Sequence, residues 1–197
     1  MQNIVAIVMA AGLSSRMGKF KQLLPYKDKT VLTYILSELL ASKVSNTYVV
    51  IGHNNQQVLE KVSGYKVQTI YNPDYQEGMH TSVMCGVNAI DQDCDGFMVV
   101  LGDQPEISFN LVNSLIDYKQ QSDKGIIIPS FNFKAGHPVV FDKKYIPLVS
   151  EINPESGLKS LVSANKHDID YMNVTDESIL IDIDTPSDYE KLVKRST

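Results

Sequence analysis

The residues best suited to chemistry lie in a loop that follows the first apolar segment of the chain. This loop, 10–22, reads Ala-Ala-Gly-Leu-Ser-Ser-Arg-Met-Gly-Lys-Phe-Lys-Gln. Small residues directly after a strand let the backbone approach a ligand closely, and free N–H groups there can bind phosphates. The stretch 16–29 carries five basic residues and one acidic residue. This charge suits a triphosphate ligand; the alternative is a solvated loop with scattered lysines.

Two familiar phosphate-binding motifs do not fit this loop. A dinucleotide fingerprint needs GxGxxG, whereas only Gly12 and Gly18 are present, six positions apart. The acid that accompanies that fingerprint is also missing from the end of the second apolar segment. A Walker A loop needs four residues between its glycines and a Ser or Thr after the lysine. Here five residues intervene and Phe20 follows Lys19, so the spacing excludes both motifs.

Three carboxylates follow apolar segments elsewhere in the chain. Asp103 comes after Val-Val-Leu-Gly, while Asp182 and Asp184 alternate with isoleucines. If 179–183 is a strand, Asp182 and Asp184 face the same side. A triphosphate carries Mg²⁺, which proteins hold through one or two carboxylates plus phosphate oxygens. Asp103 and Asp184, at two predicted strand ends, suit that role; the alternatives are a Gly-Asp turn and helix capping.

Two further motifs are weaker candidates. Gly78-Met79-His80-Thr81-Ser82 can open a helix toward a ligand, with Ser82 or Thr81 offering a hydroxyl, although a plain N-cap explains it equally well. Gly136-His137-Pro138 can bring His137 to the same site, although a lone histidine is more often structural. The histidines share no metal-ligand spacing, so the sequence predicts no zinc site.

Strands and helices alternate along the chain and would position these residues. Apolar runs bounded by Gly, Asn or Pro predict strands at 4–9, 48–51, 67–71, 97–101, 126–128, 138–141 and 179–183. Helical spacing predicts helices at 30–43, 55–62, 81–90, 111–118 and 157–164. A last helix is expected to begin at Thr185, with Pro186 in its first position. This alternation predicts an α/β fold with helices on both faces of the sheet.

Length and composition limit the remaining choices. The 197 residues, 43% of them hydrophobic, fit one domain over 1–197, and the less regular stretch 131–154 is a candidate small inserted lobe. A net charge of −5 argues against a nucleic-acid partner, which needs a basic surface. No apolar run approaches the roughly 20 residues that cross a bilayer, and the two cysteines form no disulfide framework. We therefore expect a cytoplasmic protein with no membrane partner.

In their order along the chain, these motifs resemble the nucleotidyltransferases related to molybdenum cofactor guanylyl- and cytidylyltransferases, the MobA-like NTP transferase family. The Ala-Ala-Gly loop is more similar to the cytidylyl branch, because the guanylyl branch typically has a Gly-Gly pair. The family implies a Rossmann-like three-layer sandwich, as in nucleotide-diphospho-sugar transferases, with a mostly parallel mixed sheet of about seven strands. The resemblance spans nearly the whole chain and rests on 10–18 with Lys21, Asn72-Pro73, 78–82, 101–105, 136–138 and 182–186.

The resemblance also implies roles for single residues. Arg16 and Lys21 would bind the triphosphate and stabilise the transition state, together with Asp103. Asp103 and Asp184 would hold Mg²⁺, and His137 and Asp182 are candidates for the acceptor site. Lys19 lies close to the motif, so the choice between Lys19 and Lys21 as the main catalytic lysine stays open. The implied nucleotide-binding residues are Ala10, Ala11, Gly12, Ser14, Arg16, Lys21, Ser82 and Asp103.

The expected function is Mg²⁺-dependent transfer of a nucleotidyl group from an NTP, CTP first, to molybdopterin. The products would be pyrophosphate and molybdopterin cytosine dinucleotide, and delivery of that cofactor implies transient contact with a molybdoenzyme or its chaperone. Two enzymatic alternatives stay open: GTP as the donor, and a sugar or alcohol phosphate as the acceptor. A non-enzymatic alternative is a protein that binds and delivers a pterin cofactor without turnover.

Overall fold

Strand β1 (Ile4–Ala10) lies inside the sheet, and all seven of its residues are buried. In this computed structural model, which describes residues 2–91, 93–153 and 155–195, β1 has a parallel neighbour on each side. These neighbours are β4 (Thr47–Ile51) and β6 (Gly96–Leu101). A strand covered on both faces has no solvent side, which explains the continuous apolar sequence of β1.

The sheet confirms the predicted α/β class and the mostly parallel arrangement of about seven strands. Its strand order is β10-β7-β9-β6-β1-β4-β5, with the short β8 paired to β7. Strand β9 runs antiparallel to both of its neighbours, β6 and β7. Four pairings are parallel: β1 with β4, β1 with β6, β4 with β5, and β7 with β10. The remaining strands are β5 (Gln68–Tyr71), β7 (Ile126–Phe131), β8 (Lys134–Ala135), β9 (Val139–Asp142), β10 (Ile169–Asn173) and a separate hairpin of β2 (Pro25–Tyr26) and β3 (Lys29–Thr30).

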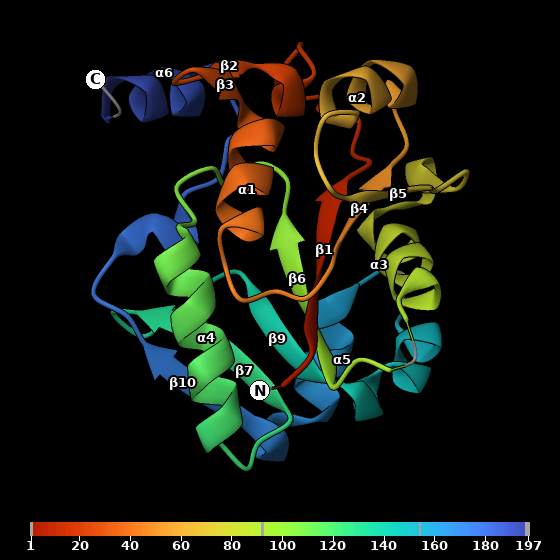
Figure 1. Ribbon diagram of the computed structural model, residues 1–197, viewed down its shortest axis with the longest axis vertical. Coiled ribbons are helices and arrows are strands. Elements are labelled where there is room, and N and C mark those ends of the chain that lie inside the picture. The colour runs from red at the N-terminus through yellow and green to blue at the C-terminus, as the bar shows by residue number, and fades with distance from the viewer. Residues whose placement is uncertain (1, 92, 154, 196–197) are drawn as a thin grey trace.

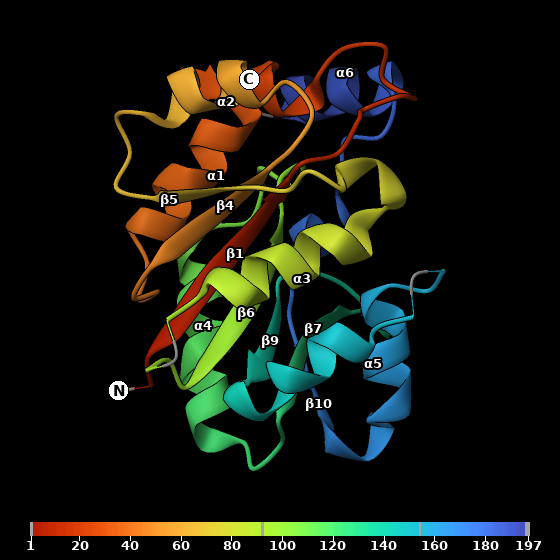
Figure 2. The same ribbon diagram turned by 90° about the vertical axis from the view of Figure 1, so that its right-hand side faces the viewer.

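Helices cover both faces of the sheet, as the two perpendicular views show (Figures 1 and 2). Side chains of α1 and α4 pack in one core, and side chains of α3 and α5 pack in the other. Alternate residues of β1 divide between the two cores, with Val8 in the first and Ile7 in the second. The helices are α1 (Val31–Leu40), α2 (Asn55–Val62), α3 (Met79–Ala89), α4 (Phe109–Gln121), α5 (Leu158–Ala164) and α6 (Pro186–Arg195).

Short 3-10 helices fill several of the connections. They are η1 (Lys21–Leu23), η2 (Tyr75–Glu77), η3 (Lys143–Tyr145), η4 (Pro147–Glu151), η5 (Lys166–Asp168) and η6 (Glu177–Leu180). The candidate lobe at 131–154 contributes β8, β9, η3 and η4, and its β9 lies within the main sheet; residue 154 is outside the described ranges. Among the described helices, none combines the length and apolar character that a bilayer crossing needs.

The last helix begins as predicted. The Thr185 N–H and hydroxyl both donate to Asp188 Oδ2, at 2.9 and 2.7 Å, and the Asp188 N–H returns a 3.3 Å bond to the Thr185 hydroxyl. This reciprocal pair satisfies donors that the first helical turn leaves open. It therefore fixes the start of α6 directly after Asp184.

The predicted strand at 179–183 is wrong. Ile179 belongs to η6, and Ile183 lies in an irregular segment, although both are almost fully buried. The Ile179 carbonyl accepts from the His137 N–H, and the Ile183 N–H donates to the Asp103 carbonyl, both at 3.1 Å. The segment is thus buried against other backbone segments without joining the sheet. Sequence reasoning missed the five-residue strand β10, at 169–173, and the two-residue strands β2, β3 and β8.

Pro129 does not end the strand that contains it, contrary to the prediction for 126–128. Strand β7 continues to Phe131, and the Pro129 carbonyl accepts from the Gly136 N–H at 2.9 Å. The N and C=O of a strand residue point to the same side, so the proline ring faces this turn and not β10. No hydrogen bond to β10 is lost, which is why the strand tolerates a proline here.

A cluster around Asp168 joins η3 to the start of β10. The Asp168 carboxylate accepts from the Tyr145 hydroxyl at 2.5 Å and pairs with the Lys144 ammonium at 2.7 Å. Burial raises the pKa of Asp168, but the contacts with Lys144 and Tyr145 outweigh it and lower this pKa to about 2. The cluster therefore favours the ionised carboxylate in the folded state.

This cluster predicts part of the acid sensitivity of the fold. A carboxyl whose native pKa is depressed contributes stability above its unfolded value, about 4, and that stability is lost as pH falls to about 2. We expect Asp168→Asn to lower the free energy of unfolding at neutral pH by about 1–3 kcal/mol. We also expect the variant to lose less stability than wild type between those two pH values. Thermal unfolding across that range measures both effects, and an equal loss in both proteins would contradict the assignment.

Candidate active site

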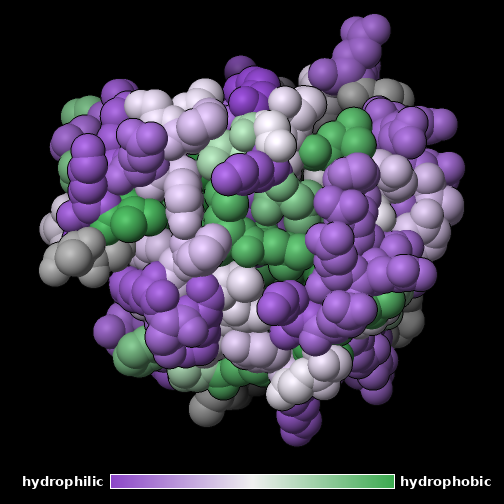
Figure 3. All heavy atoms as spheres, turned by 90° about the horizontal axis from the view of Figure 1, so that it is seen from above, coloured by the Kyte–Doolittle hydropathy of each residue, from purple (hydrophilic) through white to green (hydrophobic). Residues whose placement is uncertain are grey.

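A pocket of about 500 Å³ opens where β1 and β6 end side by side. The carboxyl edge of a parallel sheet is where open α/β folds bind ligands. Seen from above, hydrophobic side chains gather at the centre of this face, within a rim of hydrophilic ones (Figure 3). The pocket is lined by Met9, Ala11, Gly12, Leu13, Ser15, Arg16, Lys21, Gln22, Tyr75, Gln76, Gly78, Met79, Ser82, Leu101, Gly102 and Asp103.

Gly102 brings the end of β6 against the end of β1. Its N–H donates to the Met9 carbonyl at 3.1 Å, and a Cβ on Gly102 would lie 2.5 Å from that carbonyl oxygen. That separation is far below van der Waals contact, so any larger residue would push the two strands apart. The close approach places Asp103 directly beside the loop that follows β1.

Lys21, Asp103 and Asp184 form one ion cluster at the charged end of the pocket. Lys21 Nζ lies 2.5 Å from Asp103 Oδ2 and 3.1 Å from Asp184 Oδ1. Only 14% of the Lys21 side chain and 16% of the Asp103 side chain are exposed. Burial lowers the pKa of Lys21, but the two carboxylates outweigh it and raise that pKa. Lys21 is therefore a fixed ammonium ion at this position.

The loop itself positions Lys21. Ser14 has a positive φ of 53°, and its hydroxyl accepts from the Lys21 N–H and donates to Gln22 Oε1, both at 3.2 Å. Ser14 does not line the pocket, so its side chain shapes the loop and does not face a ligand there. This hydrogen bond ties the loop to Lys21, the first residue of η1, whose ammonium pairs with Asp103.

Arg16 extends the cluster to the rim of the pocket. Its guanidinium lies 2.9 Å from Asp184 Oδ2, and 71% of its side chain is exposed. Asp184 thus contacts both Lys21 and Arg16, although it does not itself line the pocket. Two cations and two carboxylates meet here, as a ligand with phosphates and a metal requires.

Some of the other predicted site residues line the pocket and some do not. Ala11, Gly12 and Ser82 line the pocket, while Ala10 is fully buried within β1 behind it. Lys19 is exposed and lies outside the pocket, and within the described part of the chain the structure gives it no ion pair. The position of the ammonium therefore favours Lys21 over Lys19.

The two candidates for the acceptor site lie outside this pocket. Asp182 lines a neighbouring hollow together with Asp188 and Lys191. His137 is partly buried, and burial lowers its pKa, with the Val99 backbone and the Asp103 charge acting in the opposite direction. His137 is thus a neutral imidazole near Asp103 at neutral pH. Asp182 nevertheless lies within electrostatic range of the ion cluster: burial, followed by the charges of Asp184 and Asp103, raises its pKa, and the Lys21 charge opposes this rise.

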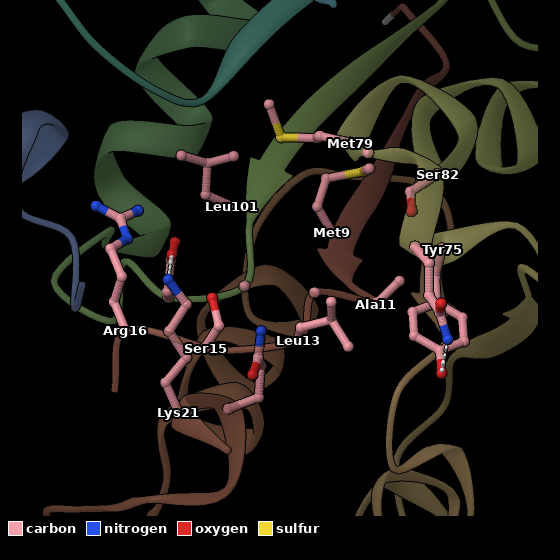
Figure 4. Close-up of a pocket in the computed structure, with 16 residues that line it drawn as sticks. Met9, Ala11, Leu13, Ser15, Arg16, Lys21, Tyr75, Met79, Ser82 and Leu101 are labelled. Atoms are coloured by element: carbon pink, nitrogen blue, oxygen red, sulfur yellow. Dashed lines mark hydrogen bonds and ion pairs between the residues drawn. The ribbon is translucent and has the colours of Figure 1, made fainter. Parts of the chain in front are cut away.

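Sequence reasoning missed one wall of the pocket. Tyr75 and Gln76 lie on η2, and Gln22 lies on η1 with only 2% exposure. The signal available for η2 was the Asn72-Pro73 turn followed by Gly78, which marks a loop between a strand and a helix. Figure 4 shows Tyr75 and Ser82 at the side of the pocket opposite Arg16 and Lys21. The pocket is therefore charged at one end and aromatic and hydroxylated at the other.

The charged end has the donors that a divalent cation needs. Within the described residues, the buried Asp103 Oδ1 has no hydrogen-bond partner, so a bound cation would satisfy an otherwise unpaired oxygen. Within the described ranges, no group of three or more His, Cys, Asp or Glu side chains could hold a metal by itself. Two carboxylates supplemented by phosphate oxygens are a donor set that Mg²⁺ accepts. The residues present thus fit a metal that binds together with a phosphorylated ligand.

Comparison with known proteins places these features in a wider context. The profile of the MobA-like NTP transferase domain matches residues 6–169. The chain is 28% identical over 200 residues to the molybdenum cofactor cytidylyltransferase of Escherichia coli, covering 100% of this chain and 99% of that protein. It is also 25% identical over 197 residues to the nicotine blue oxidoreductase of Paenarthrobacter nicotinovorans, covering 96% of each chain.

A solved structure shares the fold over nearly the whole length. Rv0371c from Mycobacterium tuberculosis superposes with a TM-score of 0.87 at 25% identity, covering 98% of both chains. The same protein has also been crystallised as a complex with manganese. The relationship therefore extends over the entire sheet and the loops that build the pocket.

Proposed function

The chain belongs to the MobA-like NTP transferase family, a family of nucleotidyltransferases, and from that premise we propose that it transfers a cytidylyl group from CTP to molybdopterin. An oxygen of the acceptor phosphate attacks the α-phosphorus of CTP, and the bond from that phosphorus to the departing pyrophosphate breaks. The products are molybdopterin cytosine dinucleotide and pyrophosphate. The acceptor phosphate is already ionised at neutral pH, so the reaction requires no protein base.

The residues of the pocket supply positioning and charge. Lys21, held as an ammonium beside Asp103, is placed to neutralise charge on the triphosphate, and Arg16 does the same from the rim. Asp103 and Asp184 would hold Mg²⁺, which when bound supplies positive charge to phosphate oxygens. Groups that are fixed before the ligand arrives lose little reorganisation energy during the reaction. The partly buried Lys21 meets this condition better than the exposed Arg16.

The observation that carries the proposal is the meeting of Lys21, Asp103 and Asp184 at the end of the sheet. These residues are 163 positions apart at most, and a protein that only delivers a pterin does not need this ion cluster. The similarity to the cytidylyltransferase supports CTP and molybdopterin as donor and acceptor. The similarity to an oxidoreductase does not lead us to propose a dinucleotide-dependent reaction for this chain, because the loop after β1 lacks GxGxxG.

The test is pyrophosphate release measured with each of the four NTPs in the presence of Mg²⁺ and a molybdopterin source. We expect CTP with molybdopterin to give the highest kcat/KM. A preference for GTP would change the proposed reaction to guanylyl transfer. Turnover with a sugar or alcohol phosphate, and none with molybdopterin, would change the proposed acceptor. Tight pterin binding without pyrophosphate from any NTP would favour the delivery protein and overturn the proposal.

A further inference from the structure

A buried amide network stands behind the uncharged end of the pocket. Asn72 follows β5, is 2% exposed, and anchors to β4 through a 2.8 Å bond from its N–H to the Ile51 carbonyl. Its side chain meets Ser82, which is 5% exposed and lines the pocket from the first turns of α3. Asn72 itself does not line the pocket, so any effect on a ligand must pass through Ser82.

The orientation of the Asn72 amide follows from its partners. The Asp74 N–H lies 3.0 Å from Oδ1, and a backbone N–H can only donate, so that atom must be the amide oxygen. The NH₂ group then faces two hydroxyls, at 3.0 Å from Thr81 Oγ1 and 2.9 Å from Ser82 Oγ. Both hydroxyl oxygens are therefore acceptors from Asn72.

The two hydroxyls differ in where their own hydrogens go. The Thr81 hydroxyl lies 2.9 Å from the carbonyls of Asp74 and Gly78, so its hydrogen stays within the protein. Within the described ranges, the structure gives the Ser82 hydroxyl no acceptor for its hydrogen. The Asn72 amide donates to the Ser82 oxygen from the side away from the pocket. The hydroxyl hydrogen of Ser82 is therefore available to an acceptor in the pocket.

We propose that Asn72 is a positioning residue, which fixes Ser82 as a hydrogen-bond donor to an acceptor atom on the nucleotide base. The inference rests on the proposed function, because it takes CTP as the ligand. The charged end of the pocket, with Lys21 and Arg16, suits the phosphates, which leaves the opposite end, with Tyr75 and Ser82, to the base (Figure 4). Cytosine offers acceptors at O2 and N3 on its pairing edge, so a fixed donor matches it.

Asn72→Asp tests the idea with almost no change of shape. The substituted carboxylate still accepts from the Asp74 N–H, but its second oxygen would accept from Ser82 in place of donating to it. The Ser82 hydrogen would then turn away from the pocket. We expect Asn72→Asp to weaken CTP binding about tenfold, the scale of one lost hydrogen bond. Isothermal titration calorimetry with CTP and Mg²⁺ measures this loss.

Inorganic tripolyphosphate separates the proposed role from general damage. It has no base, so its affinity should stay within about twofold of wild type in Asn72→Asp. Ser82→Ala should lose about as much CTP affinity as Asn72→Asp, and the double variant should bind CTP no more weakly than Ser82→Ala alone. Asn113→Asp is the matched control. Asn113 lies on α4, and its Oδ1 accepts from the Lys43 N–H at 2.7 Å, as Asn72 Oδ1 accepts from the Asp74 N–H.

Three results would overturn the proposal. They are equal losses of CTP and tripolyphosphate affinity, unchanged CTP affinity in a folded Asn72→Asp variant, and additive losses in the double variant. Thermal unfolding of each variant shows whether it is folded. Failure of the proposed function looks different: wild type would bind CTP but release no pyrophosphate, and the binding comparison would still decide the role of Asn72. Wild type that binds no CTP would overturn both.

Discussion

Asp103→Asn is expected to lower kcat/KM for pyrophosphate release by about a thousandfold. The carboxylate is placed by Gly102 against the end of β1 and pairs with Lys21, and its buried Oδ1 has no hydrogen-bond partner within the described residues. The amide keeps the size of the side chain but removes the negative charge that a divalent cation needs. The measurement is steady-state pyrophosphate release with CTP, Mg²⁺ and the acceptor.

A second readout separates loss of metal binding from loss of fold. We expect Asp103→Asn to raise the Mn²⁺ concentration needed for half-saturation in the presence of CTP. Electron paramagnetic resonance of Mn²⁺ measures this binding. Asp117→Asn is the control, because Asp117 pairs with Lys43 at the surface, at 2.6 Å, and does not line the pocket. Wild-type turnover in Asp103→Asn would refute the assignment of this carboxylate.

Lys21→Gln is expected to lower kcat by about a hundredfold or more, the scale for removing one fixed group that stabilises developing charge. The ammonium is partly buried and held by two carboxylates, so solvent cannot readily replace it. Arg16→Gln should cost less, about tenfold, because its guanidinium is largely exposed and screened by water. Single-turnover kinetics with saturating CTP distinguishes a loss of chemistry from a loss of binding.

Lys19→Gln is the matched control for Lys21→Gln. Lys19 has the same charge and lies two positions away, but it is exposed and outside the pocket. We expect its variant to keep kcat within about threefold of wild type. A larger loss in Lys19→Gln than in Lys21→Gln would reverse the assignment of the catalytic lysine.

The sequence predicted the central sheet well and its C-terminal side poorly. Strands such as β1 are buried on both faces, so their apolar runs are continuous and easy to recognise. Strand β10 is half exposed, with only Met172 buried, and its polar residues hide the pattern. Ile183 produced the opposite error, since a fully buried residue in an irregular segment has the same apolar signal as a strand. Hydrophobicity reports burial, and it does not report how the backbone is hydrogen-bonded.

The charged half of the site was easier to predict than the uncharged half. Arg16, Lys21 and Asp103 follow strands that end at the same edge of the sheet, so their meeting follows from topology. Tyr75 and Gln22 carry no charge pattern, and their place in the pocket depends on how η1 and η2 pack. The donor orientation of Ser82 depends on a three-residue hydrogen-bond network, which only the folded chain reveals.

The contacts of Lys21 also bear on how two ligands influence each other. A divalent cation offered alone must compete for Asp103 and Asp184 with an ammonium that is tethered in place. A cation that arrives with a triphosphate meets less competition, because the phosphates offer the displaced ammonium new partners. Metal and nucleotide should therefore bind with positive cooperativity, and this coupling must be equal in both directions. The same lysine that balances the charge of the ligand-free chain is thus expected to discriminate against bare metal ions in favour of a metal–nucleotide complex.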